Sequence, residues 1–314
     1  MGIKITLPDK IETLFQEIAR DNLSGAAQLF YKSLDLFPAL ADAIGKSSRQ
    51  NRKLLFEVSN RLLKLQPTMA PFVHLSRYVS RMAEANFRPE VLETAFRAFP
   101  HAARRTLQKQ RRKIMQIALQ NCASFQRILT HSKSSMVEMF LNQWLADSPA
   151  REIWMTEGRP VCEGRLFLQL LEKFKNRKVL LVDDARAMAV QSVDAIVIGA
   201  DRVSEKYITN KIGTYSLALL AREFDKPVFV LAEKIKFLPE SFPLESEPQH
   251  APDEVAQGLE NIQVYNYYFE HVPCELMDHF VTPEGSLSPA DLVPFFEQGE
   301  WDIFKLEDAE ENLA

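Results

Sequence analysis

Asp201 is the residue whose type and position are best suited to chemistry. It follows the apolar run at residues 195–198 and the Gly199-Ala200 pair, so its carboxylate is expected at a shielded strand end. Loss of hydration there raises a carboxyl pKa, and nearby cations lower it. A carboxylate held in this way can move a proton between adjacent carbons of a sugar. The spacing alone favours a simpler role, in which Asp201 caps a loop or a helix N-terminus.

Residues 209–214 are the best candidate for binding an anion. They open a predicted helix at 210–225, where Asn210 or a threonine would be the N-cap. The free N–H groups and the dipole of a helix N-terminus attract phosphate, and Lys211 adds a mobile positive charge. Helix caps are far commoner than phosphate sites, so the segment indicates an anion site without requiring one.

Further charged residues follow the other apolar runs. Arg159 comes after the run at 153–155 and could clamp the same anion with two parallel hydrogen bonds. Its alternative is an ion pair with a nearby carboxylate, and the candidates are Glu157, Glu163 and Asp183. Lys236 follows the run at 228–231. Because ligands bind beyond the carboxyl ends of parallel strands, this rim of carboxylates and cations is the expected site.

Other kinds of chemistry find little support in the sequence. The six histidines have no HxxxH or HExxH spacing, and there is no GxGxxG or Walker loop, so neither a metal nor a cofactor is expected. The three cysteines are too few for a disulfide framework and are expected to be small buried side chains in a reducing cytoplasm. A net charge of −4 argues against direct nucleic-acid binding. No apolar run approaches the roughly 18 residues of a membrane span, so a cytoplasmic protein without a membrane segment is expected.

The elements that must position these residues begin with helices. Apolar residues recur at helical spacing throughout the first third of the chain. The predicted helices are 9–20, a segment that follows residues 24–26, 50–66, and 102–128, which is the longest.

From about residue 128 the pattern changes to short apolar runs without alternation. The runs lie at 153–155, 179–182, 195–198 and 228–231, and helical patterns at 164–175 and 210–225 separate them. Such runs are typical of strands buried on both faces of a parallel sheet, and the alternation of strand and helix indicates a doubly wound sheet. We therefore predict an α/β protein with a helical N-terminal domain at 1–120 and a Rossmann-like domain at 121–314, which ends in an acidic tail at about 297–314.

A basic run and the acidic tail are the main charge asymmetries. Six basic residues and no acidic one lie between Arg104 and Lys113, and seven acidic residues lie between Glu297 and Ala314 against Lys305 alone. A solvated helix face is the commoner meaning of such a run, and a surface that faces a phosphate or a partner is the alternative.

Several motifs resemble those of the initiation factor 2B-related family. The matching segments include 128–132, 157–164, 193–201, 210–215 and 236–237. Ordered matches extend from about residue 121 to 294, whereas the helical part matches mainly through residues 24–26. The family contains the alpha, beta and delta regulatory subunits of the translation initiation factor 2B complex. It also contains two isomerases, which act on methylthioribose 1-phosphate and ribose 1,5-bisphosphate.

The resemblance implies a helical domain on a Rossmann-like domain of the phosphosugar-isomerase-like type. It also implies dimers or larger assemblies through the C-terminal domain. In the isomerases the aspartate that matches Asp201 transfers the proton, and the pair that matches Asn210 and Lys211 binds substrate. The further substrate-binding positions that the resemblance assigns are Ser24, Gly25, Ala26, Arg159, Glu163 and Lys236.

Two residues depart from the isomerase pattern. Ser132 stands where the isomerases have a catalytic cysteine, and a serine hydroxyl is far less acidic than a thiol of pKa about 8.5. Glu163 stands where they have a glutamine that contacts substrate. Its charge would repel a phosphate unless Arg159 or Arg165 neutralised it.

These departures leave three hypotheses about function. The first, which they favour, is a regulatory-subunit-like protein that binds a sugar phosphate or a related anionic metabolite without efficient catalysis. The second is an active aldose–ketose isomerase in which Asp201 transfers the proton and Ser132 or a water replaces the thiol. The third is an interaction subunit without a ligand, which uses the basic helix and the acidic tail to dock protein partners.

Overall fold

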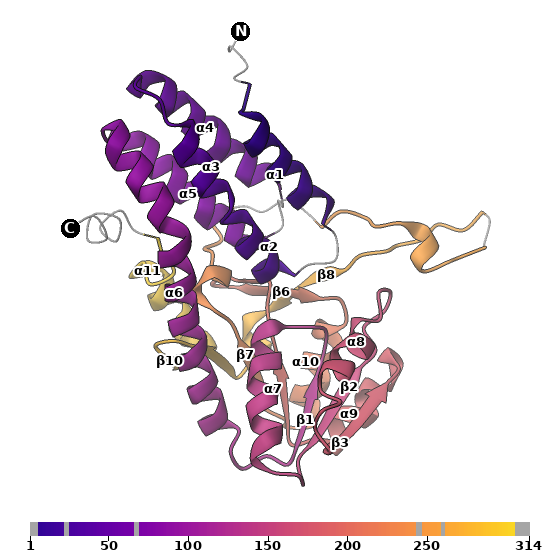
Figure 1. The fold of residues 1–314 in the computed structure, drawn as a ribbon. Helices are drawn as coiled ribbons and strands as arrows, with labels where there is room; N and C mark the ends of the chain where they lie inside the picture. Colours follow the sequence, from indigo (N-terminus) through magenta and orange to yellow (C-terminus); the bar gives the residue numbers. More distant parts are fainter. Residues whose placement is uncertain (1–5, 22–24, 66–68, 243–246, 259–260, 305–314) are drawn as a thin grey trace. The chain divides into compact units, whose positions relative to one another are not determined.

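The chain forms two compact units, which are drawn in Figure 1. The computed structural model describes residues 6–21, 25–65, 69–242, 247–258 and 261–304. The helical unit comprises Met1–Lys109 and Glu300–Ala314, and the Rossmann-like unit comprises Gln110–Gly299.

Amphipathic helices build the helical unit. They are α1 (Asp9–Arg20), α2 (Ala26–Ser33), α3 (Leu36–Ala43), α4 (Ser48–Leu65), α5 (Ala70–Glu84) and the first part of α6 (Pro89–Asn121). The periodicity at 9–20 and 50–66 therefore predicted helices correctly. The helix predicted at 102–128 instead begins at Pro89, because proline needs no N–H partner in a first turn, and ends at Asn121.

An aromatic core in the helical unit surrounds the segment at 301–304. Tyr78 of α5 stacks on Phe99 of α6 with ring centroids 4.1 Å apart, and Phe304 meets Phe99 edge-on at 5.1 Å. The ring of Trp301 lies 5.8 Å from that of His74. The beginning of the acidic tail is thus part of a hydrophobic core.

The Rossmann-like unit contains a seven-stranded sheet in the order β10-β9-β7-β4-β1-β2-β3. Its strands are β1 (Arg127–Thr130), β2 (Glu152–Thr156), β3 (Arg177–Leu181), β4 (Ala195–Ile198), β7 (Val228–Leu231), β9 (His279–Thr282) and β10 (Gly285–Leu287). All neighbours run parallel except β9 and β10. The predicted fold class, a helical region with a mostly parallel α/β sheet, is confirmed.

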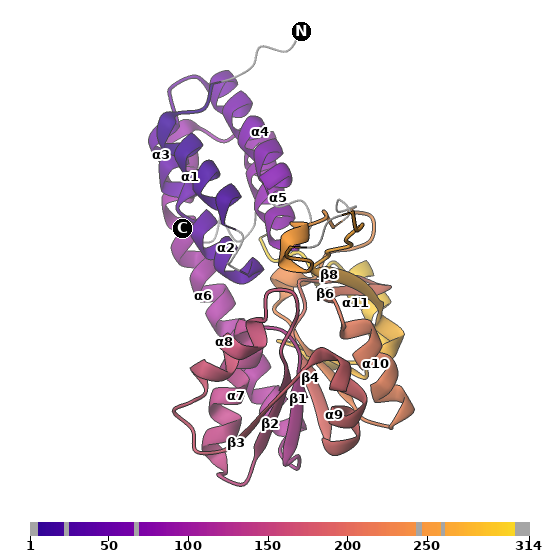
Figure 2. The same cartoon turned by 90° about the vertical axis from the view of Figure 1, so that its right-hand side faces the viewer.

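Helices cover both faces of this sheet. They are α7 (Ser135–Asp147), α8 (Glu163–Leu170), α9 (Arg186–Ser192), α10 (Thr214–Glu223) and α11 (Leu292–Glu297). Figure 2 shows α7 and α8 on one face and α9 and α10 on the other. Since β1 and β4 are neighbours and the connections leave them in opposite directions, the sheet has a switch point between these two strands.

The Rossmann-like unit also contains a second, smaller sheet, which is antiparallel. It has the order β5-β6-β8, with β5 (Arg202–Val203), β6 (Tyr207–Lys211) and β8 (Phe269–Pro273). The prediction of one helix over 210–225 is therefore wrong at its start, because residues 207–211 form β6 and α10 begins only at Thr214. Gly213, with φ of +100°, makes the turn between them.

The run at 179–182 was expected to form a strand buried on both faces, and this expectation is wrong. It forms β3, the last strand of the sheet, and Leu180 and Val182 are exposed. A sheet edge has a neighbour on one side only, so an apolar run there does not ensure burial.

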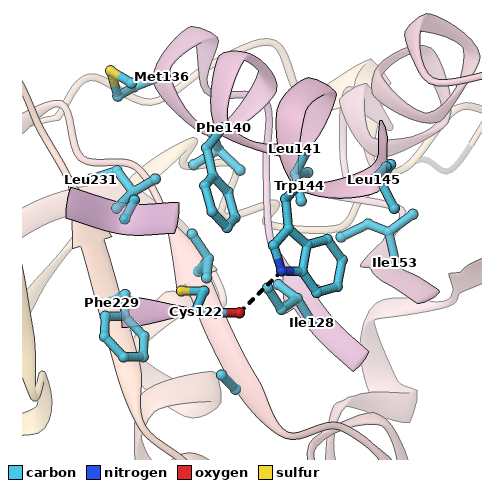
Figure 3. Close-up of a cluster of buried hydrophobic side chains, with 14 of the residues drawn as sticks. Cys122, Ile128, Met136, Phe140, Leu141, Trp144, Leu145, Ile153, Phe229 and Leu231 are labelled. Atoms are coloured by element: carbon cyan, nitrogen blue, oxygen red, sulfur yellow. Dashed lines mark hydrogen bonds between the residues drawn. The ribbon is translucent and has the colours of Figure 1, made fainter. Parts of the chain in front are cut away.

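The core of the Rossmann-like unit lies under α7. Trp144 is completely buried among Phe140, Ile128 and Ile153, and its indole N–H donates a hydrogen bond to the Cys122 carbonyl at 3.2 Å, as Figure 3 shows. These contacts fix α7 against β1 and β2 and hold the ends of these strands in place.

Throughout the described ranges, no helix combines the length and the apolar character that crossing a membrane requires.

Candidate functional site

Two of the predicted site residues follow the carboxyl ends of β1 and β4, the two strands at the switch point. Ser132 comes two residues after β1 and Asp201 comes three residues after β4. An added Cβ on Gly199 would lie 2.4 Å from the Ser134 hydroxyl, so only glycine lets the two loops approach so closely. The sheet topology therefore brings these two segments together.

Asp201 pairs with Lys236. The Lys236 ammonium lies 3.4 Å from Asp201 Oδ1, and the two side chains are 7% and 22% exposed. The backbone N–H of Asp201 donates to the Thr209 carbonyl of β6 at 2.8 Å. The carboxylate is thus held at a strand end, largely shielded from water, with a cation beside it.

Glu163 joins Ser132 to Lys211. The Ser132 hydroxyl donates to Glu163 Oε1 at 2.9 Å, and the Lys211 ammonium lies 3.2 Å from the same oxygen. Lys211 also lies 4.9 Å from the centre of the Tyr268 ring. Glu163 is therefore neutralised by Lys211, and not by either of the arginines considered for this role, since Arg165 pairs with Glu157.

Asn210 and Lys211 are buried residues of β6 and not the cap of a helix. The Asn210 amide donates to the Thr214 hydroxyl at 3.0 Å, and this hydroxyl donates to the Lys211 carbonyl at 2.6 Å. Both interactions fix the turn from β6 into α10. The asparagine is therefore a positioning group in this structure, while the lysine supplies the charge.

Glu270 occupies the N-terminus of α10, where the sequence indicated an external anion. Its carboxylate accepts hydrogen bonds from the backbone N–H groups of Gly213 at 2.7 Å and Tyr215 at 2.9 Å. The β6–β8 pairing places Glu270 opposite Asn210, which explains how a residue so distant in sequence becomes the cap. An anion at this helix terminus would have to displace Glu270.

Arg159 is exposed, and its backbone forms a hydrogen bond that fixes the position of the loop. Its N–H donates to Asp183 Oδ2 at 2.7 Å, while the Asp183 carboxylate pairs with Arg186 at 3.3 Å. Its guanidinium forms no ion pair within the described part of the chain, so the predicted pairing with Glu157, Glu163 or Asp183 is absent there. The side chain is available for an anion.

His131 is a buried residue of the site that the sequence did not single out. Its Nε2 lies 2.9 Å from the Ile212 carbonyl and its Nδ1 lies 2.5 Å from the Thr156 hydroxyl. Because a carbonyl only accepts, Nε2 carries the proton and Nδ1 accepts from Thr156. Burial lowers the pKa of His131 to about 4, so the ring is neutral at pH 7. Its position between β1 and Ser132 was the signal that could have found it.

Tyr268 and Glu254 extend the site beyond Lys211. The Tyr268 hydroxyl donates to Glu254 Oε1 at 2.7 Å, and the ring of His250 stacks on Tyr268 at 3.6 Å. Burial, followed by the hydrogen bond to Glu254, raises the pKa of Tyr268, which keeps it protonated. The sequence did not single out either Tyr268 or Glu254.

The remaining predicted residues lie elsewhere. Gly25 precedes α2 and Ala26 begins it, so both belong to the helical unit, and Ser24 lies outside the described residues.

Cys162 is partly exposed, which corrects the expectation that all three cysteines are buried. Burial raises the pKa of the Cys122 and Cys274 thiols to about 12. In the segments that the structure describes, no three His, Cys, Asp or Glu side chains gather as metal ligands would.

Known proteins resemble this chain over nearly its whole length. A putative translation initiation factor eIF-2B subunit 2-like protein of Pyrococcus horikoshii is 26% identical, with 90% of this chain and 98% of the relative aligned. The ribose 1,5-bisphosphate isomerase of Methanocaldococcus jannaschii is 24% identical, with 97% of each covered.

Solved structures share the fold. The translation initiation factor eIF-2B structure from Pyrococcus horikoshii OT3 has a TM-score of 0.75 and 24% identity over 91% of this chain and all of that one. The 5-methylthioribose 1-phosphate isomerase from the same organism has a TM-score of 0.73 and 22% identity, over 92% and 88% of the two chains.

A family model decides the classification. The model of the initiation factor 2 subunit family matches residues 9–289. This range includes the candidate site, called the strand-end site below, which consists of Ser132, Arg159, Glu163, Asp201, Asn210, Lys211 and Lys236. The resemblance inferred from the motifs is thereby confirmed, and the chain belongs to the initiation factor 2 subunit family.

Proposed function

We propose that this protein binds a sugar phosphate or a related anionic metabolite at the strand-end site, as a regulatory-subunit-like member of its family without efficient catalysis. Two observations carry the proposal together, namely the Ser132–Glu163–Lys211 cluster and the Asp201–Lys236 ion pair. A ligand phosphate would compete with Glu163 and Asp201 for the ammonium groups of Lys211 and Lys236, and the carboxylate of Asp201 can accept hydrogen bonds from sugar hydroxyls. The second acid–base group of an isomerase is replaced by a hydroxyl.

The chemistry of Ser132 explains the expected lack of turnover. A thiol with a pKa of about 8.5 can exchange a proton near neutral pH, and an alkyl hydroxyl cannot. In addition, the Ser132 proton is directed at Glu163 Oε1, which fixes the hydroxyl as a donor. Proton transfer would then depend on Asp201 alone.

An isomerase is the second candidate, and the position of Asp201 favours it. Its carboxylate is shielded and lies beside Lys236, as a group that takes a proton from a bound sugar should. Full-length relatives that are ribose 1,5-bisphosphate isomerases support it as well. The two candidates share the ligand class and differ in turnover.

Titration and a turnover assay together test both candidates. We expect calorimetry with pentose and hexose phosphates to show binding, with no isomerisation of the same compounds. Ser132→Cys, which restores the thiol, is expected to gain turnover that Asp201→Asn then removes. Turnover by the unmodified protein that Asp201→Asn abolishes would favour the isomerase, whereas no binding at millimolar ligand would contradict both and favour an interaction subunit.

Oligomer formation through the Rossmann-like unit is a further part of the proposal. Leu166 and Leu170 of α8 and Leu180 of β3 are exposed at the edge of the sheet. An eIF2B beta–delta complex from Chaetomium thermophilum, with a TM-score of 0.70 and 18% identity over 94% of this chain and 95% of that one, is titled a tetramer. Burial of such side chains between two copies would be favourable by about 25 cal/mol per Å².

Charged substitutions test this surface. Leu170→Glu with Leu180→Glu is expected to convert the oligomer to a monomer in sedimentation, because two carboxylates cannot be buried unpaired. Leu63→Glu in α4 is the matched control, since Leu63 and Leu170 are both 44% exposed. A doubly charged variant that still sediments as an oligomer would show that another surface is used.

A further inference from the structure

We infer that Tyr268 is a positioning residue for Lys211, and that the largely exposed segment at 247–256 acts on the strand-end site through Tyr268. The inference rests on the proposed function in one respect, because it takes Lys211 to serve ligand binding. It adds what holds the charge of this lysine in place and which part of the chain can move it. The contacts of the Lys211 ammonium group and the hydrogen bonds of the segment carry it.

The main chain beside Lys211 is fixed from several sides. The Lys211 carbonyl accepts a hydrogen bond from the Thr214 hydroxyl at 2.6 Å. The N–H of Ile212 donates to the Tyr268 carbonyl at 2.8 Å, and the Ile212 carbonyl accepts from His131 at 2.9 Å. These bonds fix the point from which the Lys211 side chain leaves the backbone. The direction of its flexible four-carbon stem depends on the partners of the ammonium group.

Two partners of different kinds hold this ammonium group. It lies 3.2 Å from Glu163 Oε1 and 4.9 Å from the centre of the Tyr268 ring. The attraction of a cation to the face of an aromatic ring is stronger when the cation is shielded from water, and the Lys211 side chain is only 4% exposed. Since the ring carries no net charge, it holds Lys211 without neutralising it. Tyr268 therefore helps to fix where this positive charge of the site lies.

The orientation of the Tyr268 ring is set by residues of the segment at 247–256. The ring of His250 stacks on it, with centroids 3.6 Å apart and an angle of 5° between the planes. The Tyr268 hydroxyl donates to Glu254 Oε1 at 2.7 Å. Glu247 Oε1 accepts from the Tyr268 N–H at 3.3 Å and from His250 Nε2 at 2.9 Å. The face of the ring that meets the ammonium group thus depends on three side chains of this segment.

The same segment is joined to the rest of the Rossmann-like unit close to Tyr268. Residues 251–255 are exposed, and Figure 1 shows this part of the chain in light orange, next to β8. In the described part of the chain, every hydrogen bond that leaves residues 247–256 ends in residues 264–268. Asn266, which takes part in these bonds, is buried. A displacement of the exposed segment is therefore passed to Tyr268 and from there to the ammonium group.

The NMR signal of the Lys211 side chain tests the inference without a ligand. Protons over the face of an aromatic ring resonate upfield, so the signal of the Lys211 ε-methylene group reports its contact with Tyr268. The full-length protein is made with isotope-labelled lysine, and Lys211→Arg assigns the signal. We expect Tyr268→Phe to keep the upfield shift, since the ring remains, and Tyr268→Leu to lose it. A structural role of Tyr268 elsewhere would not move this signal.

Variants of the exposed segment test whether it acts through the ring. His250→Ala removes the ring stacked on Tyr268 and is expected to move the Lys211 signal toward its position in Tyr268→Leu; it also tests the inference by itself if Tyr268→Leu does not fold. Gln249→Ala is the matched control from the same segment, because the Gln249 amide donates to the Val264 carbonyl at 2.6 Å, and it is expected to leave the signal unchanged. An unchanged signal in Tyr268→Leu would overturn the inference. A signal that moves in Tyr268→Leu but not in His250→Ala would overturn the role of the segment.

Titration with ribose 5-phosphate relates the contact to binding. Tyr268→Leu is expected to weaken binding roughly fivefold, and Tyr268→Phe by less than about twofold. Equal affinities despite a lost upfield shift would overturn the inference, because the position of Lys211 would then not govern binding. No binding by the unmodified protein, together with the expected NMR shifts, would contradict the proposed function and leave the positioning of Lys211 supported.

Discussion

Lowering the pH from 7 to 4 is expected to destabilise the Rossmann-like unit by up to about 3 kcal/mol through His131 alone. Burial lowers the pKa of His131 to about 4, below the value of about 6.5 expected in the unfolded chain. Between these two values the unfolded chain binds a proton that the folded chain does not. The contribution of His131 is therefore complete above pH 6.5 and is lost as the pH falls toward 4.

Urea unfolding at several pH values measures this effect. The slope of the free energy of unfolding between pH 6.5 and 4 is expected to be shallower in His131→Gln than in the unmodified protein, because glutamine does not titrate. His271→Gln is the control, since His271 is an exposed residue of β8 that contacts Thr209. Equal slopes in the unmodified protein and His131→Gln would contradict the assignment of His131 as a neutral buried ring.

Replacing Asp302 by alanine is expected to lower the free energy of unfolding of the helical unit by about 3 kcal/mol. Asp302 accepts hydrogen bonds from Arg81 Nη1 at 3.1 Å and Arg77 Nη2 at 3.4 Å, and its side chain is 14% exposed. Burial raises the pKa of Asp302, but the hydrogen bond and the charge of Arg81 outweigh this and hold it below its usual value. Removing the carboxylate takes away the negatively charged acceptor that Arg77 and Arg81 share, and both guanidinium groups are partly buried.

The matched control is Asp42→Ala. Asp42 also pairs with two cations, Lys10 and Arg97, but on the exposed surface of the helical unit. Exposed ion pairs contribute little to stability because water and salt screen them. Chemical denaturation that showed equal losses for the two variants would refute the structural role assigned to the segment at 301–304.

His131 and Asp302 resemble the charged residues of the candidate site in one respect. Both are polar residues whose properties depend on partners far away in sequence, namely Ile212 for His131 and Arg81 for Asp302. The charges of the proposed ligand site follow the same pattern, since Glu163 is neutralised by Lys211 and Asp201 by Lys236. The local sequence shows which polar and charged residues are present, but the tertiary structure determines which of them form ion pairs and hydrogen bonds with one another.

The sequence determined the family, the central strands and the segments that form the site. The runs at 195–198 and 228–231 coincide with β4 and β7, because strands buried on both faces must be apolar at every position. Asp201 and Lys236 were predicted at the site because such strands end at one edge of the sheet. Lys211 was predicted at the start of a helix, and the structure places it in β6. Helical periodicity likewise located α1 and α4 in the helical unit.

Only the tertiary structure decided how the charges are paired, which residue caps α10 and which strand lies at the edge of the sheet. Glu270 caps α10 through its place opposite Asn210, β3 is exposed because it is the last strand, and Glu163 faces Lys211 because β6 passes beside the loop at 158–163. These contacts join residues that are distant along the chain. Hydrophobic periodicity reports the burial of a segment within its own helix or strand, whereas charge pairing depends on which other segment folding places beside it.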